Sequence, residues 1–175
     1  MEDAALVERA AAGDEVAFEA MVRRHTDAVW RLARANLRDD FAAEEAVQDT
    51  FVKAHRALAG FRGDASVRTW LLAICQRTCI DISRRKRPTV VSLDEARRAR
   101  AREEQPELTV ALDQAMGRLS DDERRAFTLV DVLGYSREEA AQIVGVPPST
   151  MRSRVAKARL RLMDALGDAP SESTR

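Results

Sequence analysis

The stretch from Ser136 to Met163, SREEAAQIVGVPPSTMRSRVAKARLRLM, predicts a short helix, a tight turn and a longer helix. Ser136 and Glu139 have the spacing of a capping box, so the first helix should begin directly after Ser136. Gly145 can adopt the left-handed conformation that ends a helix, and the two prolines that follow turn the chain. Pro148 suits the first turn of the next helix. The pattern therefore indicates two helices joined by a turn of only a few residues.

The longer helix combines an apolar stripe with a cationic face. The stripe recurs at spacings of three and four and consists of Met151, Val155, Ala158 and Leu162. The basic residues, with no acidic residue among them before Met163, are Arg152, Arg154, Lys157, Arg159 and Arg161. The major groove of DNA, about 12 Å wide, admits one α-helix with phosphates on both sides. A solvated amphipathic helix is the plain alternative, but the turn chemistry and the charge together favour a DNA-binding helix-turn-helix.

Composition predicts an all-α fold. The chain has 175 residues, enough for one ordinary domain or two small ones. Aromatic residues are sparse, and Ala, Leu and Val carry most of the apolar content, which suits helices better than sheets. No apolar run approaches the ~20 residues of a membrane span, and the N-terminus lacks the apolar core of a signal peptide. We therefore expect a cytoplasmic protein.

The sequence offers little for catalysis or metal binding. Cys75 and Cys79, the two cysteines, lie four residues apart on one expected helix face and lack further ligands. Core packing is their simplest interpretation, and a redox role stays open. His25 and His55 are expected at the edge of the core and at the surface. Without metal-ligand spacing, a nucleophile–base pair or a phosphate-binding glycine loop, we expect neither an enzyme nor a cofactor.

Charge is patchy although the net charge is zero. One short segment is acidic and contains Asp39, Asp40, Glu44, Glu45 and Asp49. Another is basic and contains Arg77, Arg84, Arg85, Lys86 and Arg87. Because partners meet local patches rather than the summed charge, the zero net charge does not argue against nucleic acid.

Apolar periodicity divides the chain into two helical parts. Residues 88–107, PTVVSLDEARRARAREEQPE, contain proline near both ends, alternating charge and no sustained apolar stripe, which indicates a linker. A second capping box, Ser120 with Glu123, begins a helix beyond it. The expected organisation is an N-terminal helical domain at 1–87, a linker at 88–107, a C-terminal helical domain at 108–167 and a frayed tail at 168–175.

Three passages together resemble the extracytoplasmic-function sigma factors, small promoter-recognition subunits of bacterial RNA polymerase. They are AEEAVQDTFVKAHRAL (43–58), FRGDASVRTWLLAI (61–74), and LSDDERRAF (119–127) with the helix-turn-helix itself. The resemblance covers about residues 14–87 and 108–166. It implies a sigma factor that binds core polymerase and directs promoter recognition and melting.

The first passage is similar to the family's core-polymerase-binding segment. The resemblance names its partner as the coiled coil of the beta-prime subunit, with the beta subunit as a further polymerase contact. With Val47 and Phe51 facing inward, an acidic and amide-bearing face is left outside. The expected core-polymerase-binding residues are Glu44, Glu45, Gln48 and Asp49.

The second passage resembles the family's promoter-melting segment, whose loop captures a flipped base of the minus-ten element. A loop with Gly, Asp, Ser and an aromatic ring can stack on and hydrogen-bond an extruded base. A plain helix-connecting loop capped by Asp64 or Ser66 is compatible with this role. On the helix after the loop, we expect Gln76 to face solvent. At the position of Arg77, members of the family that this passage resembles often carry Asn. The expected minus-ten residues are Phe61, Arg62, Gly63, Asp64, Ser66, Arg77, Asp81, Arg84 and Arg85.

The third passage resembles the domain that binds the minus-thirty-five element. Arg152 should lie opposite the apolar stripe, where it can reach a base edge, and Arg159 lies further along, toward the phosphates. The expected minus-thirty-five residues are Pro148, Ser149, Thr150, Arg152, Ser153, Arg154 and Lys157.

Other functions stay open at this point. A conventional helix-turn-helix regulator would bind duplex DNA without polymerase, but it leaves the passages at 43–58 and 61–74 unexplained. An enzyme site in the N-terminal domain lacks candidate residues, and a chain that keeps the fold without transcription activity is a third possibility. Whether an anti-sigma factor sequesters the protein is also open.

Overall fold

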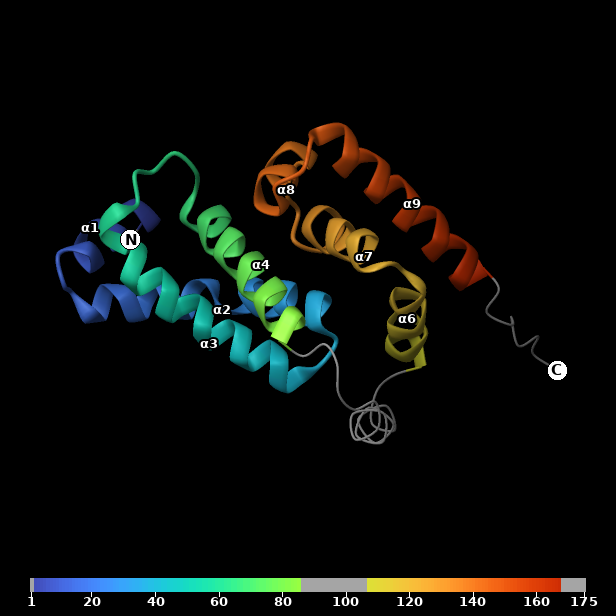
Figure 1. Cartoon of the computed structure of the whole chain (residues 1–175), viewed down its shortest axis with the longest axis horizontal. Helices are drawn as coiled ribbons and strands as arrows, with labels where there is room; N and C mark the ends of the chain where they lie inside the picture. Colours follow the sequence, from blue (N-terminus) through green and yellow to red (C-terminus); the bar gives the residue numbers. More distant parts are fainter. Residues whose placement is uncertain (1, 86–106, 168–175) are drawn as a thin grey trace.

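The computed structural model describes residues 2–85 and 107–167, and every regular element in these two segments is helical (Figure 1). The first segment contains α1 (Asp3–Ala11), α2 (Glu15–Leu37), α3 (Asp40–Ala57), the 3₁₀ turn η1 (Leu58–Gly60) and α4 (Val67–Arg85). The second contains α6 (Glu107–Arg118), α7 (Asp121–Phe127), the π-helical turn η2 (Thr128–Val132), α8 (Arg137–Val144) and α9 (Pro148–Gly167). The all-α prediction is confirmed for these residues. Nearly all of the predicted linker and the predicted tail lie outside them.

Local sequence signals set the helix ends. Both predicted capping boxes form: Ser136 with Glu139 at the start of α8, and Ser120 with Glu123 at the start of α7. In each, the serine hydroxyl accepts a backbone N–H and the glutamate accepts the serine N–H, so two otherwise unsatisfied donors are paired. Gly145 ends α8 with φ 76°, the left-handed conformation that favours glycine.

The N-terminal half is a bundle in which α2, α3 and α4 pack on one another and α1 lies against α2. Its core includes Met21, Leu32, Leu71 and Leu72. Cys75 and Cys79 are buried with their Sγ atoms 3.9 Å apart, so the core-packing interpretation is confirmed. The hydrogen bond with the Cys79 thiol, together with burial, raises the pKa of Cys75 well above its ordinary value and disfavours the reactive thiolate.

The C-terminal half packs α9 across α6, α7 and α8. The predicted apolar stripe of α9 is buried. One irregularity has no counterpart in the sequence analysis: η2 continues α7 as a π-helical turn, and the N–H of Leu133 donates to the carbonyl of Thr128 at 2.9 Å.

The two halves also pack against each other. The α2 helix contacts α7 and η2, and α4 contacts α8. Leu129, Tyr135 and Ile143 belong to the same apolar cluster as the core of the N-terminal half. The Arg68 guanidinium lies 4.8 Å from the ring centroid of Tyr135, and burial raises the pKa of Tyr135 to about 12. We call this interface between α2 and α4 on one side and α7, η2 and α8 on the other the domain seam.

Two methionines of α9 differ in burial, so their substitution should affect stability differently. Met151 is 0% exposed and Met163 is 70% exposed. Met151→Ala should lower the free energy of unfolding by about 2–5 kcal/mol, because it removes buried methylenes and leaves a cavity. Met163→Ala should change it by no more than about 0.5 kcal/mol. Urea denaturation of both variants measures the difference, and equal effects would contradict the observed orientation of α9.

Candidate nucleic-acid interface

The start of α9 presents a polar surface directly after a tight turn. The N–H groups of Thr150 and Met151 both donate to the carbonyl of Pro147, at 3.0 and 3.1 Å, which closes the first turn of the helix. Most of the predicted groove-facing residues are exposed, namely Pro148, Ser149, Arg152, Ser153 and Lys157, and Thr150 is half-buried. The arrangement exposes hydroxyls and cations on the first turns of α9.

Acidic residues of the same half already pair with three of the α9 arginines. Arg154 is half-buried and binds Asp122 of α7. Arg159 binds Asp131 at 2.7 Å, and Arg161 binds Glu123 at 2.6 Å. Within residues 2–85 and 107–167, Arg152 and Lys157 make no ion pair. These two cations are therefore the α9 charges most available to an external anion. Arg159 is less suited to a phosphate contact than its sequence position suggests, because Asp131 already pairs with it.

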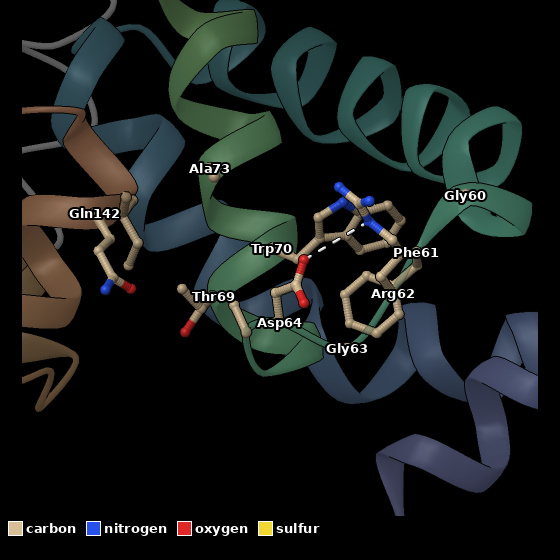
Figure 2. A pocket seen from close by; sticks show the side chains of 11 residues that line it. Gly60, Phe61, Arg62, Gly63, Asp64, Thr69, Trp70, Ala73 and Gln142 are labelled. Atoms are coloured by element: carbon tan, nitrogen blue, oxygen red, sulfur yellow. Dashed lines mark ion pairs between the residues drawn. The ribbon is translucent and has the colours of Figure 1, made fainter.

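The loop between η1 and α4 forms one wall of a hollow of about 290 Å³. Phe61 stacks at a tilt on Trp70, with ring centroids 4.9 Å apart. Gly63 takes φ 78°, a left-handed conformation that lets the loop turn sharply. The exposed side chains of Arg62 and Asp64 form a long ion pair at 3.8 Å (Figure 2). An aromatic platform beside a carboxylate and a guanidinium can stack on and hydrogen-bond a flat heterocycle.

Ser66 caps the N-terminus of α4. Its Oγ accepts the Thr69 N–H at 3.1 Å and lies 2.8 Å from the Thr69 hydroxyl. The capping role considered in the sequence analysis therefore belongs to Ser66, and the Asp64 carboxylate stays exposed on the loop. The far wall of the hollow was not predicted: Gln142 and Ile143 of α8 line it opposite the loop (Figure 2).

Along α4 the predicted basic face is only partly open. The side chains of Arg77, Asp81, Arg84 and Arg85 are exposed, and Asp81 lies 3.6 Å from the Lys53 ammonium. The expectation that Gln76 faces solvent is wrong, because its side chain is 2% exposed. Gln76 therefore does not belong to the exposed face of α4 that carries the charged residues.

The outer face of α3 carries the predicted acidic surface. Small residues, Ala42, Ala43 and Ala46, pack inward. This leaves Glu44, Glu45 and Gln48 exposed and Asp49 half-buried. Among the described residues none of these four side chains makes an ion pair, so their charge is available to a basic partner.

The structure adds two observations about what the described residues lack. No three His, Cys, Asp or Glu side chains within 2–85 and 107–167 come together as a metal-binding group. None of the helices in those segments combines the length and the hydrophobicity needed to cross a bilayer.

Comparison with known proteins finds two family segments in the order that the sequence predicts. The family model of Sigma-70 region 2 matches residues 21–89, and that of Sigma-70, region 4 matches residues 109–162. The first includes α3, the loop and α4; the second includes the helix-turn-helix of α8 and α9.

Individual relatives align with most of the chain. The ECF RNA polymerase sigma factor SigM of Mycobacterium tuberculosis is 39% identical over 166 residues, covering 94% of this chain and 85% of that protein. The probable RNA polymerase sigma-C factor of Mycobacterium bovis is 37% identical, covering 91% and 88%. Among solved structures, CnrH in complex with the cytosolic domain of CnrY has a TM-score of 0.72 at 30% identity, covering 96% of this chain and 99% of that one.

Proposed function

The chain belongs to the extracytoplasmic-function sigma factors, and we propose that it performs the work of this family through three separate surfaces. It is an alternative sigma factor that directs transcription initiation. The family is not one of catalytic enzymes. The observation that carries this conclusion is that both Sigma-70 regions match this chain in order. A relative that is 39% identical and aligns with 94% of the chain supports it.

The first surface is the start of α9, which we assign to the minus-thirty-five element. Its exposed cations, Arg152 and Lys157, form no ion pair with a carboxylate of the described residues. Arg152 lies outward from the buried stripe, near the helix N-terminus, where a helix in the major groove meets base edges. Lys157 lies more than one turn further on, in a position suited to a phosphate.

The second surface is the loop with the exposed residues of α4, which we assign to melted minus-ten DNA. The Phe61–Trp70 stack and the Asp64 carboxylate border a hollow large enough to receive part of an unstacked base. Arg84 and Arg85 at the other end of α4 can hold backbone phosphates. The domain boundaries of the sequence analysis follow from this division and stay a proposal.

The third surface is the acidic face of α3, which we assign to core polymerase. Its unpaired carboxylates, with Gln48 between them, offer acceptors to a basic helical partner such as the beta-prime coiled coil. The exposed apolar side chain of Val52, at 48%, extends the same face. An anti-sigma factor is a further candidate partner, because the similar protein CnrH forms a complex with the cytosolic domain of CnrY.

Transcription in vitro tests the whole assignment. Purified chain, core polymerase and a fragmented genomic library should together give promoter-specific transcripts, and their start sites should return the consensus of both elements. A conventional helix-turn-helix regulator would instead bind palindromic duplex alone and would give no transcripts with core polymerase.

Charge reversal on α3 should weaken polymerase binding. Glu45→Lys with Asp49→Lys replaces two acceptors by cations that repel a basic partner, while both positions tolerate the change because neither is in the core. Pull-down with core polymerase should show loss of binding at unchanged helical content by circular dichroism. Glu8→Lys, at an exposed position of α1, is the matched control for charge reversal. Undiminished binding of the α3 variant would show that the surface is wrongly assigned.

The loop variants separate base capture from helix capping. Asp64→Ala should impair open-complex formation more than closed-complex binding, because a base pocket acts only after the DNA is unstacked. Ser66→Ala should instead lower stability by about 1 kcal/mol through loss of the α4 cap. Permanganate footprinting on pre-melted and duplex promoters measures the first effect, and thermal unfolding measures the second. Equal defects of Asp64→Ala on both templates would exclude a role in base capture.

Substitutions in α9 should separate effects on sequence specificity from effects on overall DNA affinity. Arg152→Ala should relax preference at one position of the minus-thirty-five element, since a bidentate guanine contact discriminates by about 1–3 kcal/mol. Lys157→Ala should weaken binding evenly across sequences and reduce the salt slope by about one. Arg159→Ala should have a smaller effect on that slope, because Asp131 already neutralises Arg159. Holoenzyme binding to a randomised upstream element at two salt concentrations measures the effects of all three variants. An unchanged sequence preference for Arg152→Ala would mean that α9 binds the groove in a different orientation.

A further inference from the structure

The two cysteines of α4 lie next to each other inside the N-terminal half. Cys75 and Cys79 are separated by one turn of the helix, and their Sγ atoms are 3.9 Å apart. Their side chains are 0% and 2% exposed. The sequence contains no other cysteine, so both thiols of this protein belong to one pair of adjacent sulfur atoms.

A disulfide does not fit this pair. Side chains four residues apart on a helix have Cβ atoms about 5–6 Å apart, whereas a disulfide holds its Cβ atoms about 3.5–4.5 Å apart. Oxidation would therefore require α4 to deform inside the core. In addition, the hydrogen bond with Cys79 and burial raise the pKa of Cys75, which disfavours the thiolate that attacks an oxidant.

The same geometry suits a cation held between the two sulfur atoms. A thiolate–metal bond is about 2.3 Å long, so two sulfur atoms on one cation lie about 3.8 Å apart at a tetrahedral angle and about 4.6 Å apart in a straight line. The observed separation of 3.9 Å lies within this range. Two ligands four residues apart on one helix face are also what the zinc-binding H-E-x-x-H motif uses. The pair can therefore hold a cation without movement of the α4 backbone.

The number of ligands selects the kind of cation. Thiolates prefer soft metals, among them Cu(I) and Zn(II). A structural zinc needs four ligands in a tetrahedron, and within residues 2–85 and 107–167 no third His, Cys, Asp or Glu completes a group with this pair. Monovalent Cu(I) forms stable complexes with two thiolates alone. The pair therefore suits Cu(I) better than zinc.

The surroundings of the pair are apolar. Both cysteines belong to the same buried cluster as Leu71, Leu72 and Ile82. The Cys75 thiol donates to the carbonyl of Val29, a fully buried residue of α2, at 3.6 Å. A site without water or carboxylates favours a soft cation of low charge, because such a cation loses less hydration free energy on burial than a divalent one.

Cys79 connects the pair to the surface of the protein. It borders a small hollow of about 110 Å³, which is also lined by Ser83, Arg84 and Arg125. A cation that enters this hollow meets the Cys79 sulfur first, and Cys75 is the next ligand. The positive charges of the two arginines offset the negative charge of a complex with two thiolates.

We propose that Cys75 and Cys79 form a binding site for a soft monovalent cation, Cu(I), within α4. One Cu(I) replaces the protons of both thiols, so its uptake releases two protons to water and leaves a complex with one net negative charge, at unchanged oxidation state. The inference concerns metal binding and does not rest on the role of α4 at the minus-ten element. Because the cation joins two successive turns of α4, the loaded chain should be more stable than the free chain.

Competition for Cu(I) tests the site. The full chain, kept anaerobic with reduced thiols, should withdraw one equivalent of Cu(I) from a chromophoric chelator, and Cu(I) should raise its melting temperature. Cys75→Ala and Cys79→Ala should each abolish both effects, because a single thiolate remains. Alanine keeps these positions small and apolar, and circular dichroism checks that the variants are folded. Met163→Leu is the matched control, since it removes an exposed sulfur atom outside the pair and should change neither effect.

X-ray absorption at the copper edge gives a second measurement that needs no variant. The loaded wild-type chain should show two sulfur neighbours and no nitrogen neighbour, and Zn(II) should not be retained under the same conditions. Stoichiometric Cu(I) binding that persists in both alanine variants, or nitrogen ligands on copper, would overturn the proposal. Retention of Zn(II) as tight as that of Cu(I) would do so as well.

Discussion

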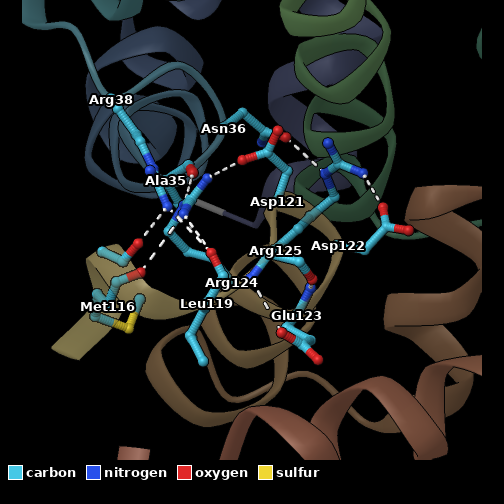
Figure 3. A network of polar contacts seen from close by, with 12 residues as sticks. Ala35, Asn36, Arg38, Met116, Leu119, Asp121, Asp122, Glu123, Arg124 and Arg125 are labelled. Carbon is cyan, nitrogen blue, oxygen red and sulfur yellow. Dashed lines mark hydrogen bonds and ion pairs between the residues drawn. The ribbon is translucent and has the colours of Figure 1, made fainter. Parts of the chain in front are cut away.

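Two helix C-termini end at the same place in this protein, and their unsatisfied carbonyl groups must find donors there. The last four carbonyls of a helix have no partner within it, and the end carries a partial negative charge. Here the ends of α2 and α6, which belong to different halves, lie within reach of the single buried guanidinium of Arg124 (Figure 3). Without cations between them, the two negative ends would repel and their carbonyls would be left unpaired. Because Arg124 lies on α7, these hydrogen bonds hold α7 against the end of α2.

The same interface connects indirectly to the recognition helix. The two carboxylate oxygens of Asp122 bind different arginines: one binds Arg125, which reaches across the seam, and the other binds Arg154 of α9. Burial lowers the pKa of Arg125, and the nearby carboxylates of Asp122 and Asp121 oppose that shift. Through Asp122, the domain seam and Arg154 of α9 belong to one network of charge-assisted hydrogen bonds. Movement at the seam can therefore alter how firmly Arg154 is held.

Local features of this fold follow from the sequence, and the features that depend on the seam do not. Both capping boxes, the glycine that ends α8 and the buried stripe of α9 depend on residues within a few positions of one another, and each was predicted correctly. Arg124 and Gln76 are different. Arg124 lies in the polar stretch DDERR and is buried because the end of α2, distant in the sequence, packs on it. Gln76 is expected at the surface beside Arg77, yet its side chain is 2% exposed. The surfaces assigned to DNA and polymerase were likewise recognisable as exposed or charged segments, but the closure of α8 over the loop hollow has no local signal.

A two-part DNA-binding protein gains specificity from the spacing of its two modules. Two weak DNA-binding modules on one tether gain affinity through effective concentration, but only when their separation matches the spacing of the two promoter elements. The acidic face of α3 lies outside the domain seam and is exposed while the two halves are packed together, so a basic partner can reach it in this arrangement.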